Sequence, residues 1–554
     1  MAKLAACDYF VRLLRAVLVR PSLLSSAGIQ IEETELQPDA VQRSTPIVTG
    51  HSTNLLRSFR LMPARTVRCG SLLPAVVLCV TWLVASPPAF SQTTKGSTEA
   101  TEDDVSGKPG GKDSGLPVGL IQNRQVLPEM EIDDEKYTDA LELEFTRKTK
   151  TAFEKALGSG ALTDQEKKDI EAGAKYWIYR FTMKKYREEE APKKDERPAT
   201  GAAKNAAPKE RLPDLRKKLL DLVKVYAKTP VAREYFLKQV VERCSELLDN
   251  NFVVRQNIIL LLGQLSSNYP PPGKPLEPTP YDAAYPVLLK VIKEEKQHDA
   301  LKVDAVVGLL RICRLGLPLP DANNDKKRAE IAMTLVPELA KKNTHWWYQA
   351  RLAECLGAAG VTFDPANKPN PIVLQTLAEV VANSNGERHL QARVEAAKAI
   401  GRLPLDNQLN MAPVVYHIVK LGDQIVQANN ANPKKEPWGN YFFTPQPQLG
   451  FGLYYAFRAE NGAARVPGGK RKPGLMDALP GAKDVQDAYG QILLMTLHFI
   501  DNPGKPVAAP QLKSVEGWLQ THVPANNRIT AGTPPLIAKP DPANGKAAPA
   551  AAAP

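Results

Sequence analysis

Four aromatic residues in one short segment, Trp438, Tyr441, Phe442 and Phe443, are the side chains best suited to contact a ligand. They belong to a stretch of twenty residues, 438–457, that contains eight aromatic residues with Pro and Gly between them, although only 6% of the chain is aromatic. On a loop, such rings can stack on a sugar or anchor a side chain of a protein partner. Alternatively, the loop folds back and covers the open end of a helical core. The covering role is the expected one, and the binding role is the alternative.

Two further clusters have residue types that can bind a partner. The run His345-Trp346-Trp347-Tyr348 opens an expected helix, and aromatic residues in that position usually wedge between neighbouring helices. The basic run Lys470-Arg471-Lys472 lies among Gly and Pro and can touch an acidic surface, but we expect a solvated loop.

The motifs of common enzyme classes are absent from the sequence. It contains no C-x-x-C-H, no H-E-x-x-H and no G-x-S-x-G, and Gly469-Lys470 lacks the spacing of a P-loop. None of the seven histidines lies three or four residues from another, so no helical pair of metal ligands is available. We therefore expect a non-enzyme without a cofactor or a metal ion.

The segment that starts at Met62 has the features of a secretory signal. Two arginines are followed by the apolar run Ser71–Ala85 and by the small-x-small sequence Ala89-Phe90-Ser91, which predicts cleavage before Gln92. The run has 15 residues, whereas a transmembrane helix needs roughly 20. Residues 62–91 are therefore expected to be a signal peptide, and residues 1–61 a gene-model extension or an organelle presequence. The protein is then periplasmic or secreted and has no transmembrane span after cleavage.

Charge and cysteine content agree with an exported protein. The net charge of +12 falls to +8 without residues 1–91, which carry nine Lys and Arg and five Asp and Glu. An exported protein does not normally meet nucleic acid, so a protein partner is expected, with an envelope polymer as a further candidate. Three cysteines remain after cleavage, Cys244, Cys313 and Cys355, and we expect them to be buried thiols.

Composition divides the rest of the chain into segments. Residues 92–130 are rich in Ser, Thr, Gly, Lys and Asp and predict a flexible tether, whereas residues 131–187 predict a helical hairpin. In the hairpin, Thr163 and Glu166 have the spacing of a capping box. The charged, Ala- and Pro-rich residues 188–211 predict a linker, and the Ala/Pro-rich residues 531–554 a disordered tail.

Residues 212–530 contain an internal repetition. Four similar segments begin at Val254, Leu301, Tyr348 and Ala392, and an amphipathic helix is expected before each, at 235–248, 285–295, 331–341 and 372–382. Their alignment places Gly263, Leu310, Gly357 and Gly401 in one column, at spacings of 47, 47 and 44 residues. Two helices in about 45 residues is the period of HEAT and armadillo arrays.

The first of these segments has the fullest pattern. Asp249 lies in the turn between the two helices, Val254-Arg255 opens the second helix, and Leu262-Gly263 ends it. This resembles the HEAT pattern, in which a turn aspartate caps the second helix or pairs with a neighbouring arginine. The resemblance implies an all-α protein, an α-solenoid of HEAT-like helical pairs.

Some positions depart from that pattern. Leu310 replaces the glycine, Gln349 replaces the arginine, and the loops 269–280 and 363–371 are long and proline-rich. Such arrays are surfaces onto which unrelated functions are grafted. The sequence therefore predicts an exported interaction scaffold that presents its helical surface to a protein partner. The alternative is a carbohydrate- or small-ligand-binding module that uses the aromatic segment 438–457.

Overall fold

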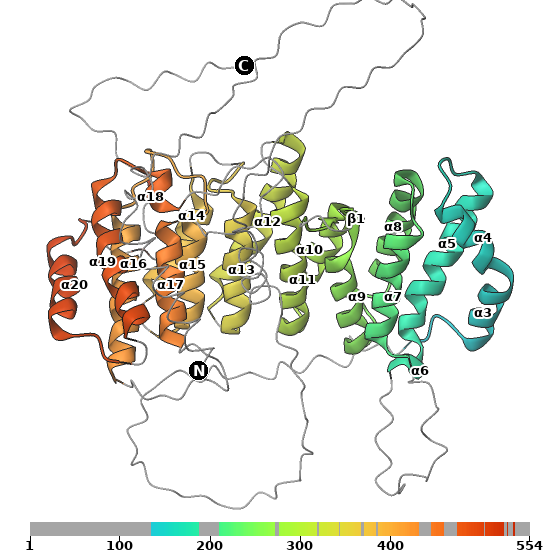
Figure 1. Ribbon diagram of the computed structural model, residues 1–554, viewed down its shortest axis with the longest axis horizontal. Helices are drawn as coiled ribbons and strands as arrows, with labels where there is room; N and C mark the ends of the chain where they lie inside the picture. The colour runs from blue at the N-terminus through green and yellow to red at the C-terminus, as the bar shows by residue number, and fades with distance from the viewer. Residues whose placement is uncertain are drawn as a thin grey trace, which may run out of the picture. The chain divides into compact units, whose positions relative to one another are not determined.

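The computed structural model describes the greater part of the chain after Asp133. The described residues are 134–187, 210–271, 276–317, 321–342, 344–366, 370–383, 386–431, 445–458, 474–502, 505–525, 529 and 536–537. Within them the protein is mostly α-helical, with 15 helices of seven or more residues (Figure 1). The expected extension, signal peptide and tether, nearly all of the linker and most of the tail lie outside these residues.

The first described helices lie within residues 134–187, where the sequence predicted a helical hairpin. They are α3 (Asp139–Glu144), α4 (Lys150–Leu157) and α5 (Asp164–Tyr179), with a π-helical turn at Phe145–Thr149. The predicted capping box is present, because the Thr163 side chain accepts from the Glu166 amide and Glu166 accepts from the Thr163 amide. The two arms pack closely: a Cβ on Gly173 would lie 2.3 Å from the Phe153 ring.

After the 3-10 turn at Arg180–Thr182 and the short α6 (Lys184–Arg187), nine longer described helices follow, most of them where the sequence predicted helices. They are α7 (Leu212–Val225), α8 (Pro230–Ser245), α9 (Phe252–Gln264), α10 (Tyr285–Lys293), α11 (Asp299–Arg311), α12 (Ala322–Ala340), α13 (Trp346–Ala359), α14 (Ile372–Ala382) and α15 (Leu390–Ile400). The proline-rich loop before α10 contains a feature that the sequence did not predict: β1 (Ser266–Asn268) pairs antiparallel with β2 (Thr279–Pro280).

The remaining described helices continue to residue 521. They are α16 (Ala412–Ala431), α17 (Pro445–Phe457), the short α18 (Leu475–Ala478), α19 (Lys483–Asp501) and α20 (Ala509–Thr521). Here the pattern changes. Gly450 near the start of α17 lies beside Phe499 near the end of α19, whereas Phe457 contacts Tyr489, so these two helices run antiparallel.

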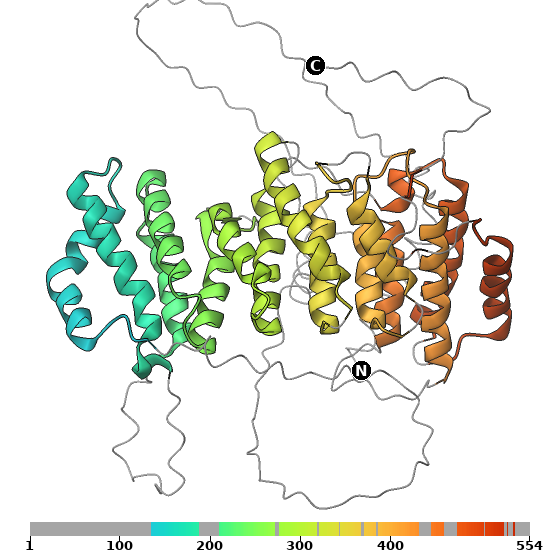
Figure 2. The same cartoon turned by 180° about the vertical axis from the view of Figure 1, so that it is seen from behind.

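The contacts between helices repeat along the chain (Figures 1 and 2). Helices α9, α11, α13, α15 and α17 each contact the next one in this series, and α10, α12, α14 and α16 do the same in a second series. Each of α10, α12 and α14 also packs on the helix that follows it. We call α9, α11, α13, α15 and α17 the second helices.

Small residues bring neighbouring second helices close together. A Cβ on Gly263 would lie 3.0 Å from the Gly308 Cα, and a Cβ on Gly357 would lie 2.8 Å from the Ala399 Cα. In both pairs the contact lies two residues before the aligned position, because Gly263 meets Gly308 and not Leu310, and Gly357 meets Ala399 and not Gly401. Neighbouring second helices therefore pack with a two-residue offset, and the Leu310 side chain is buried.

A buried polar residue recurs near the start of four second helices. Arg255, Lys302, Gln349 and Arg393 follow at the repeat spacings of 47, 47 and 44 residues, and each is less than 5% exposed. A buried polar group is costly unless it has a hydrogen-bond partner. The substitution of the expected arginine by Lys302 or Gln349 therefore changes the residue type but retains a buried polar group.

Each of these residues is bonded to a loop or a helix nearby. The Arg255 guanidinium donates to Gln297 Oε1 at 2.6 Å, and Lys302 Nζ lies 3.6 Å from a Glu338 carboxylate oxygen. Burial lowers the pKa of Lys302, and the nearby Glu338 carboxylate opposes that effect. The other two bonds are made to backbone carbonyls of the helical pair itself, Gln349 to Thr344 at 3.0 Å and Arg393 to Val381 at 2.8 Å.

The hairpin is joined to the helices after it by buried contacts. The Phe153 and Phe236 rings pack with centroids 5.6 Å apart, and α5 contacts α8. The Arg180 guanidinium, only 6% exposed, lies 2.8 Å from Glu142 and 3.1 Å from Glu210 and also donates to the Tyr186 hydroxyl. Because Tyr186 and Glu210 precede and follow residues 188–209, Arg180 fixes both ends of that segment.

Candidate functional site

The aromatic residues that the sequence singled out as a binding site, Trp438, Tyr441, Phe442 and Phe443, lie outside the described residues. The C-terminal part of the same segment forms α17. There Phe457 is fully buried, and the Tyr455 ring lies 5.8 Å from the Lys398 ammonium group.

The second aromatic cluster divides into buried and exposed parts. Tyr348 is fully buried, and its hydroxyl donates to Glu338 at 3.1 Å, as expected for a residue between helices. Burial and the Glu338 charge raise the pKa of Tyr348. Trp346 is half-buried and stacks on the His389 ring of the next second helix, with centroids 4.9 Å apart. Trp347 is 44% exposed and is the only ring of this cluster that faces outward.

Three of the histidines have a role that the sequence interpretation missed. His298, His345 and His389 are the N-cap residues of α11, α13 and α15, and each Nδ1 accepts from the backbone amide two residues later at 3.1–3.2 Å. Their spacings of 47 and 44 residues equal those of the repeat, so the signal was present in the sequence. Burial, and to a smaller extent the charge of His345, lower the pKa of His389.

The corresponding cap of α9 is an asparagine and not the expected Asp249. Asn251 Oδ1 accepts from the Val254 amide at 3.1 Å, whereas Asp249 is exposed. Arg255 bonds Gln297 of the following turn. Asn251 stands immediately before the helix, where an N-cap must lie, and Asp249 stands two residues earlier.

A charged cluster on the second helices is the most distinctive polar feature of the described surface. Glu354 on α13 is only 10% exposed; it lies 2.7 Å from an Arg314 nitrogen and also pairs with Arg351. Burial would raise the pKa of Glu354, but Arg314, Arg351, Lys398 and Arg402 together lower it below its ordinary value. The carboxylate is therefore ionised and is held by cations from three successive second helices or their C-terminal turns.

A further cation, Arg458, follows α17 and contacts other elements: it lies 5.1 Å from the Tyr489 ring centroid and 3.6 Å from an Asp477 carboxylate oxygen. We call Arg314, Arg351, Lys398 and Arg402, which surround Glu354, the basic band. Arg314 and Arg351 remain 42% and 37% exposed while they hold Glu354.

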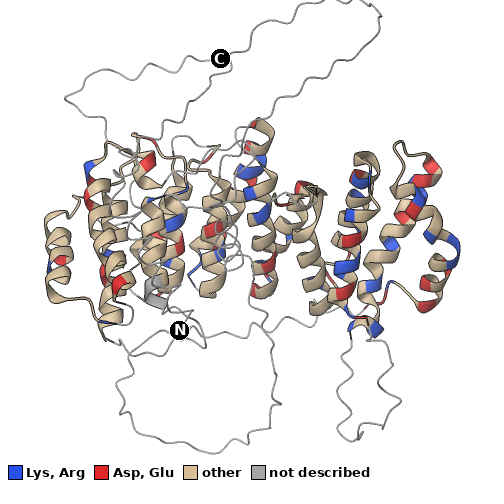
Figure 3. Ribbon diagram, viewed as in Figure 1, with Lys and Arg blue, Asp and Glu red and all other residues tan. Residues whose placement is uncertain are grey.

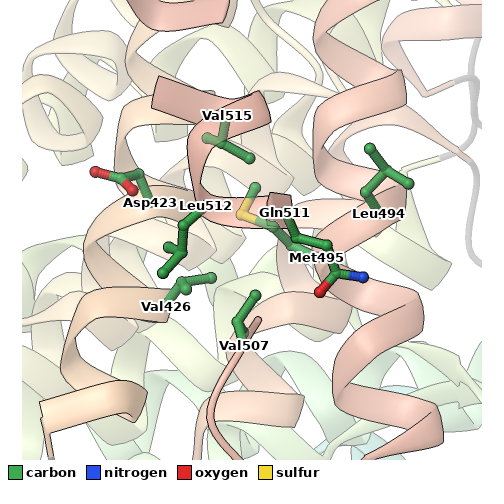
Figure 4. Close-up of a pocket in the computed structure, with 8 residues that line it drawn as sticks. All are labelled: Asp423, Val426, Leu494, Met495, Val507, Gln511, Leu512 and Val515. Carbon is green, nitrogen blue, oxygen red and sulfur yellow. The ribbon is translucent and has the colours of Figure 1, made fainter. Parts of the chain in front are cut away.

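A small hollow lies at the other end of the described array, among α16, α19 and α20 (Figure 4). Its lining consists of Asp423, Val426, Leu494, Met495, Val507, Gln511, Leu512 and Val515. The Asp423 carboxylate points away from the apolar side chains, and Gln427 donates to it at 2.7 Å. Burial, and then the Glu516 charge, raise the pKa of Asp423. The hollow is thus an apolar seam between helices without convergent polar groups.

The described residues contain no group of three or more His, Cys, Asp or Glu side chains that could hold a metal ion. The three described cysteines are buried free thiols, as expected, and the side chains of Cys313 and Cys355 hydrogen-bond to each other. None of the described helices combines the length and the apolar character that crossing a bilayer requires.

Comparison with known proteins does not assign the chain to a family. No family model matches it, and neither the curated proteins nor the solved structures contain a significant match. A function must therefore be argued from the geometry of the chain itself.

Proposed function

We propose that this chain is an exported, non-catalytic interaction scaffold, in which HEAT-like helical pairs form an α-solenoid that binds a protein partner. The observation that carries this proposal is the repeated contact pattern: each second helix contacts the next, and α10, α12, α14 and α16 form a parallel series of contacts. In an array of this kind, every added pair extends a surface that a partner can follow.

The chemistry of the described surface supports a binding role. Burial shifts the pKa values of Lys302, Tyr348 and Arg393, and each of these buried groups is bonded to a neighbouring helix. The basic band and Val307, which is 44% exposed on α11, lie instead on or near the exposed side of the second helices. A mixture of arginine, tyrosine and apolar groups is typical of protein interfaces.

Site-specific photo-crosslinking in the native cell tests the scaffold proposal. A benzophenone amino acid replaces Val307 in one variant and Val231 on α8 in a matched control, because Val231 is similarly exposed at 50% but lies outside the second helices. We expect one protein to be captured near stoichiometrically through position 307 and at less than about a tenth of that yield through position 231. Equal capture at both positions would contradict the proposal. Capture of no protein at either would also contradict it and would favour the alternative, a ligand site on residues 438–457.

The exported location has a separate test. Its basis is the sequence of residues 62–91, and it requires a mature chain that begins at Gln92. Intact-mass measurement of the protein purified from its native cell should give that N-terminus. A chain that retains residues 62–91 would contradict cleavage.

A further inference from the structure

The basic band suggests which partner chemistry the second helices accept. We propose that it binds an acidic segment of the protein partner in polyproline II conformation, with one carboxylate at every third residue. This inference rests on the scaffold function proposed above and names the chemistry of that surface.

The first argument is that the band already holds a carboxylate of its own. Glu354 keeps its charge in a largely buried position because Arg314 and Arg351 contact it directly and Lys398 and Arg402 lie close by. Arginine binds carboxylates through two parallel N–H donors, and such charge-assisted bonds are stronger than neutral ones. The side chains that hold Glu354 are therefore placed to bind a carboxylate. They are also partly exposed, so they can contact a second carboxylate from a partner.

The second argument is the net charge of this surface. Arg314, Arg351, Lys398 and Arg402 carry four positive charges, and Glu354 compensates one of them. Glu395, one helical turn before Lys398, compensates another and leaves a net charge of +2. Arg458 is neutralised by Asp477. A small positive excess suits a peptide with a few carboxylates.

The same small excess disfavours a membrane or a long polyanion as the partner. Recognition of anionic lipid typically uses clusters of about four to eight Lys and Arg. The described helices have no such block, because cationic and acidic residues are interspersed along them (Figure 3). A short acidic peptide therefore fits the band better than an extended anionic surface.

The third argument is geometric and fixes the spacing. Neighbouring packed helices lie about 8–10 Å apart, so Arg314 after α11, Arg351 on α13 and Lys398 on α15 are carried by backbones about that far apart. In polyproline II, residues three apart lie on the same side of the chain, and three steps of about 3.1 Å span about 9 Å. A carboxylate at every third residue therefore meets one second helix after another.

Apolar groups beside the band provide the remaining contacts. Val307 on α11 is 44% exposed. Its position in the sequence repeat corresponds to that of Glu354 on α13, 47 residues later, and to that of Lys398 on α15, 91 residues later. The Tyr455 ring lies next to Lys398. The intervening residues of the bound segment, prolines in particular, can pack against these side chains.

Fluorescence anisotropy with the full chain and labelled twelve-residue peptides tests the inference. The probe has four aspartates, one at every third residue, with proline and serine between them. Two control peptides have the same composition: in one isomer the four aspartates are adjacent, and in the other they stand at every second residue. We expect the probe to bind at least about fivefold more tightly than either isomer. Its affinity should fall between 50 and 300 mM salt, because exposed charge pairs are screened.

Paired variants locate the binding surface. Lys398→Gln with Arg402→Gln should weaken binding of the probe about tenfold, because each exposed ion pair contributes modestly. The control, Lys290→Gln with Lys293→Gln on α10, removes the same charge from exposed positions and should leave affinity unchanged. Arg314 and Arg351 are kept because they hold Glu354, and thermal unfolding of both variants verifies that they fold.

Several outcomes would overturn the inference. Equal affinity for the three isomers would remove the spacing argument, and equal losses in the two paired variants would indicate non-specific attraction. Tighter binding of polygalacturonate, or of phosphatidylglycerol vesicles, than of the probe would assign the band to a different class of partner. If position 307 still captures a protein in the cell, such a result would reject the acidic segment and leave the scaffold proposal standing.

Discussion

At the scale of single residues, the histidines are the clearest difference between sequence interpretation and structure. The search for metal ligands considered only pairs three or four residues apart, whereas the meaningful spacing was that of the repeat. His298, His345 and His389 cap successive second helices through Nδ1, which accepts a hydrogen bond only while that nitrogen is unprotonated. An N-cap is identifiable in sequence only once the start of its helix is known, and histidine is not a usual cap residue.

The cap at His389 makes stability depend on pH. The pKa of His389 is lower in the folded protein than its ordinary value of 6.5, so the unfolded chain binds the proton more strongly. The stability that His389 contributes is complete above about pH 6.5 and is lost as the pH falls through its folded pKa. A positive charge at a helix N-terminus is also unfavourable for the helix dipole.

We expect His389→Asn to reduce this loss of stability, because an asparagine caps a helix without titrating. Urea unfolding between pH 7.5 and 5 measures the effect, and at pH 7.5 the free energy of unfolding should change by less than about 1 kcal/mol. Asn251→Ser replaces one cap that does not titrate by another at the start of α9; it is the matched control and should leave the slope with pH unchanged. An identical slope in wild type and His389→Asn would contradict the role of the cap.

At the scale of elements, the sequence predicted most helices to within a few residues, because apolar periodicity and capping signals are local. It placed α14 at 372–382, as observed, but it missed the first nine residues of α12 and the β1–β2 ladder in the proline-rich loop. The alignment of Gly263 with Leu310 agrees with the buried polar residues Arg255 and Lys302, which recur at the same spacing of 47 residues. It did not reveal that neighbouring second helices touch through Gly263 and Gly308, because contacts between helices depend on three-dimensional packing.

The contact between Gly263 and Gly308 predicts opposite effects for two identical substitutions. Gly308→Ala would place a Cβ 2.9 Å from Leu288 Cδ1 and 3.0 Å from the Gly263 Cα, and should destabilise the protein by about 1–3 kcal/mol. Gly490→Ala, within α19, meets nothing within 4 Å and should stabilise by up to about 1 kcal/mol. Chemical denaturation compares them, and a stabilised Gly308→Ala variant would refute the close approach.

Arg180 should be the residue that fixes residues 188–209 to the hairpin. Arg180→Ala removes the cation that Glu142 and Glu210 share, whereas Lys185 still pairs with Glu142 and Lys218 with Glu210, so the loss should be about 1–3 kcal/mol. Lys167→Ala, which removes only an exposed pair with Asp164, should cost less than about 0.5 kcal/mol. Limited proteolysis should also cut Arg180→Ala faster between residues 188 and 209. A loss below about 1 kcal/mol would mean that other contacts fix this segment.

At the scale of the whole molecule, the sequence predicted a mostly helical protein, and the structure confirms this. The candidate aromatic site at Trp438, Tyr441, Phe442 and Phe443 remains a prediction, because it lies outside the described residues. The basic band was not predicted: its four cations lie between positions 314 and 402, and only the packing of successive helices brings them together around Glu354.

Double electron–electron resonance, which measures the distance between two spin labels, tests the stacked arrangement of the second helices most directly. One variant carries labelled cysteines in place of Val253 and Trp347, and a second carries them in place of Val253 and Gln391. Both are made in the full chain with Cys7, Cys69 and Cys79 changed to serine. The buried thiols of Cys244, Cys313 and Cys355 remain unlabelled. Two helix intervals separate α9 from α13 and three separate α9 from α15, so the labelled positions should lie about 16–20 Å and about 24–30 Å apart. A regular increase of this size supports a stack of helical pairs. Two equal distances, or a shorter one to Gln391, would contradict it.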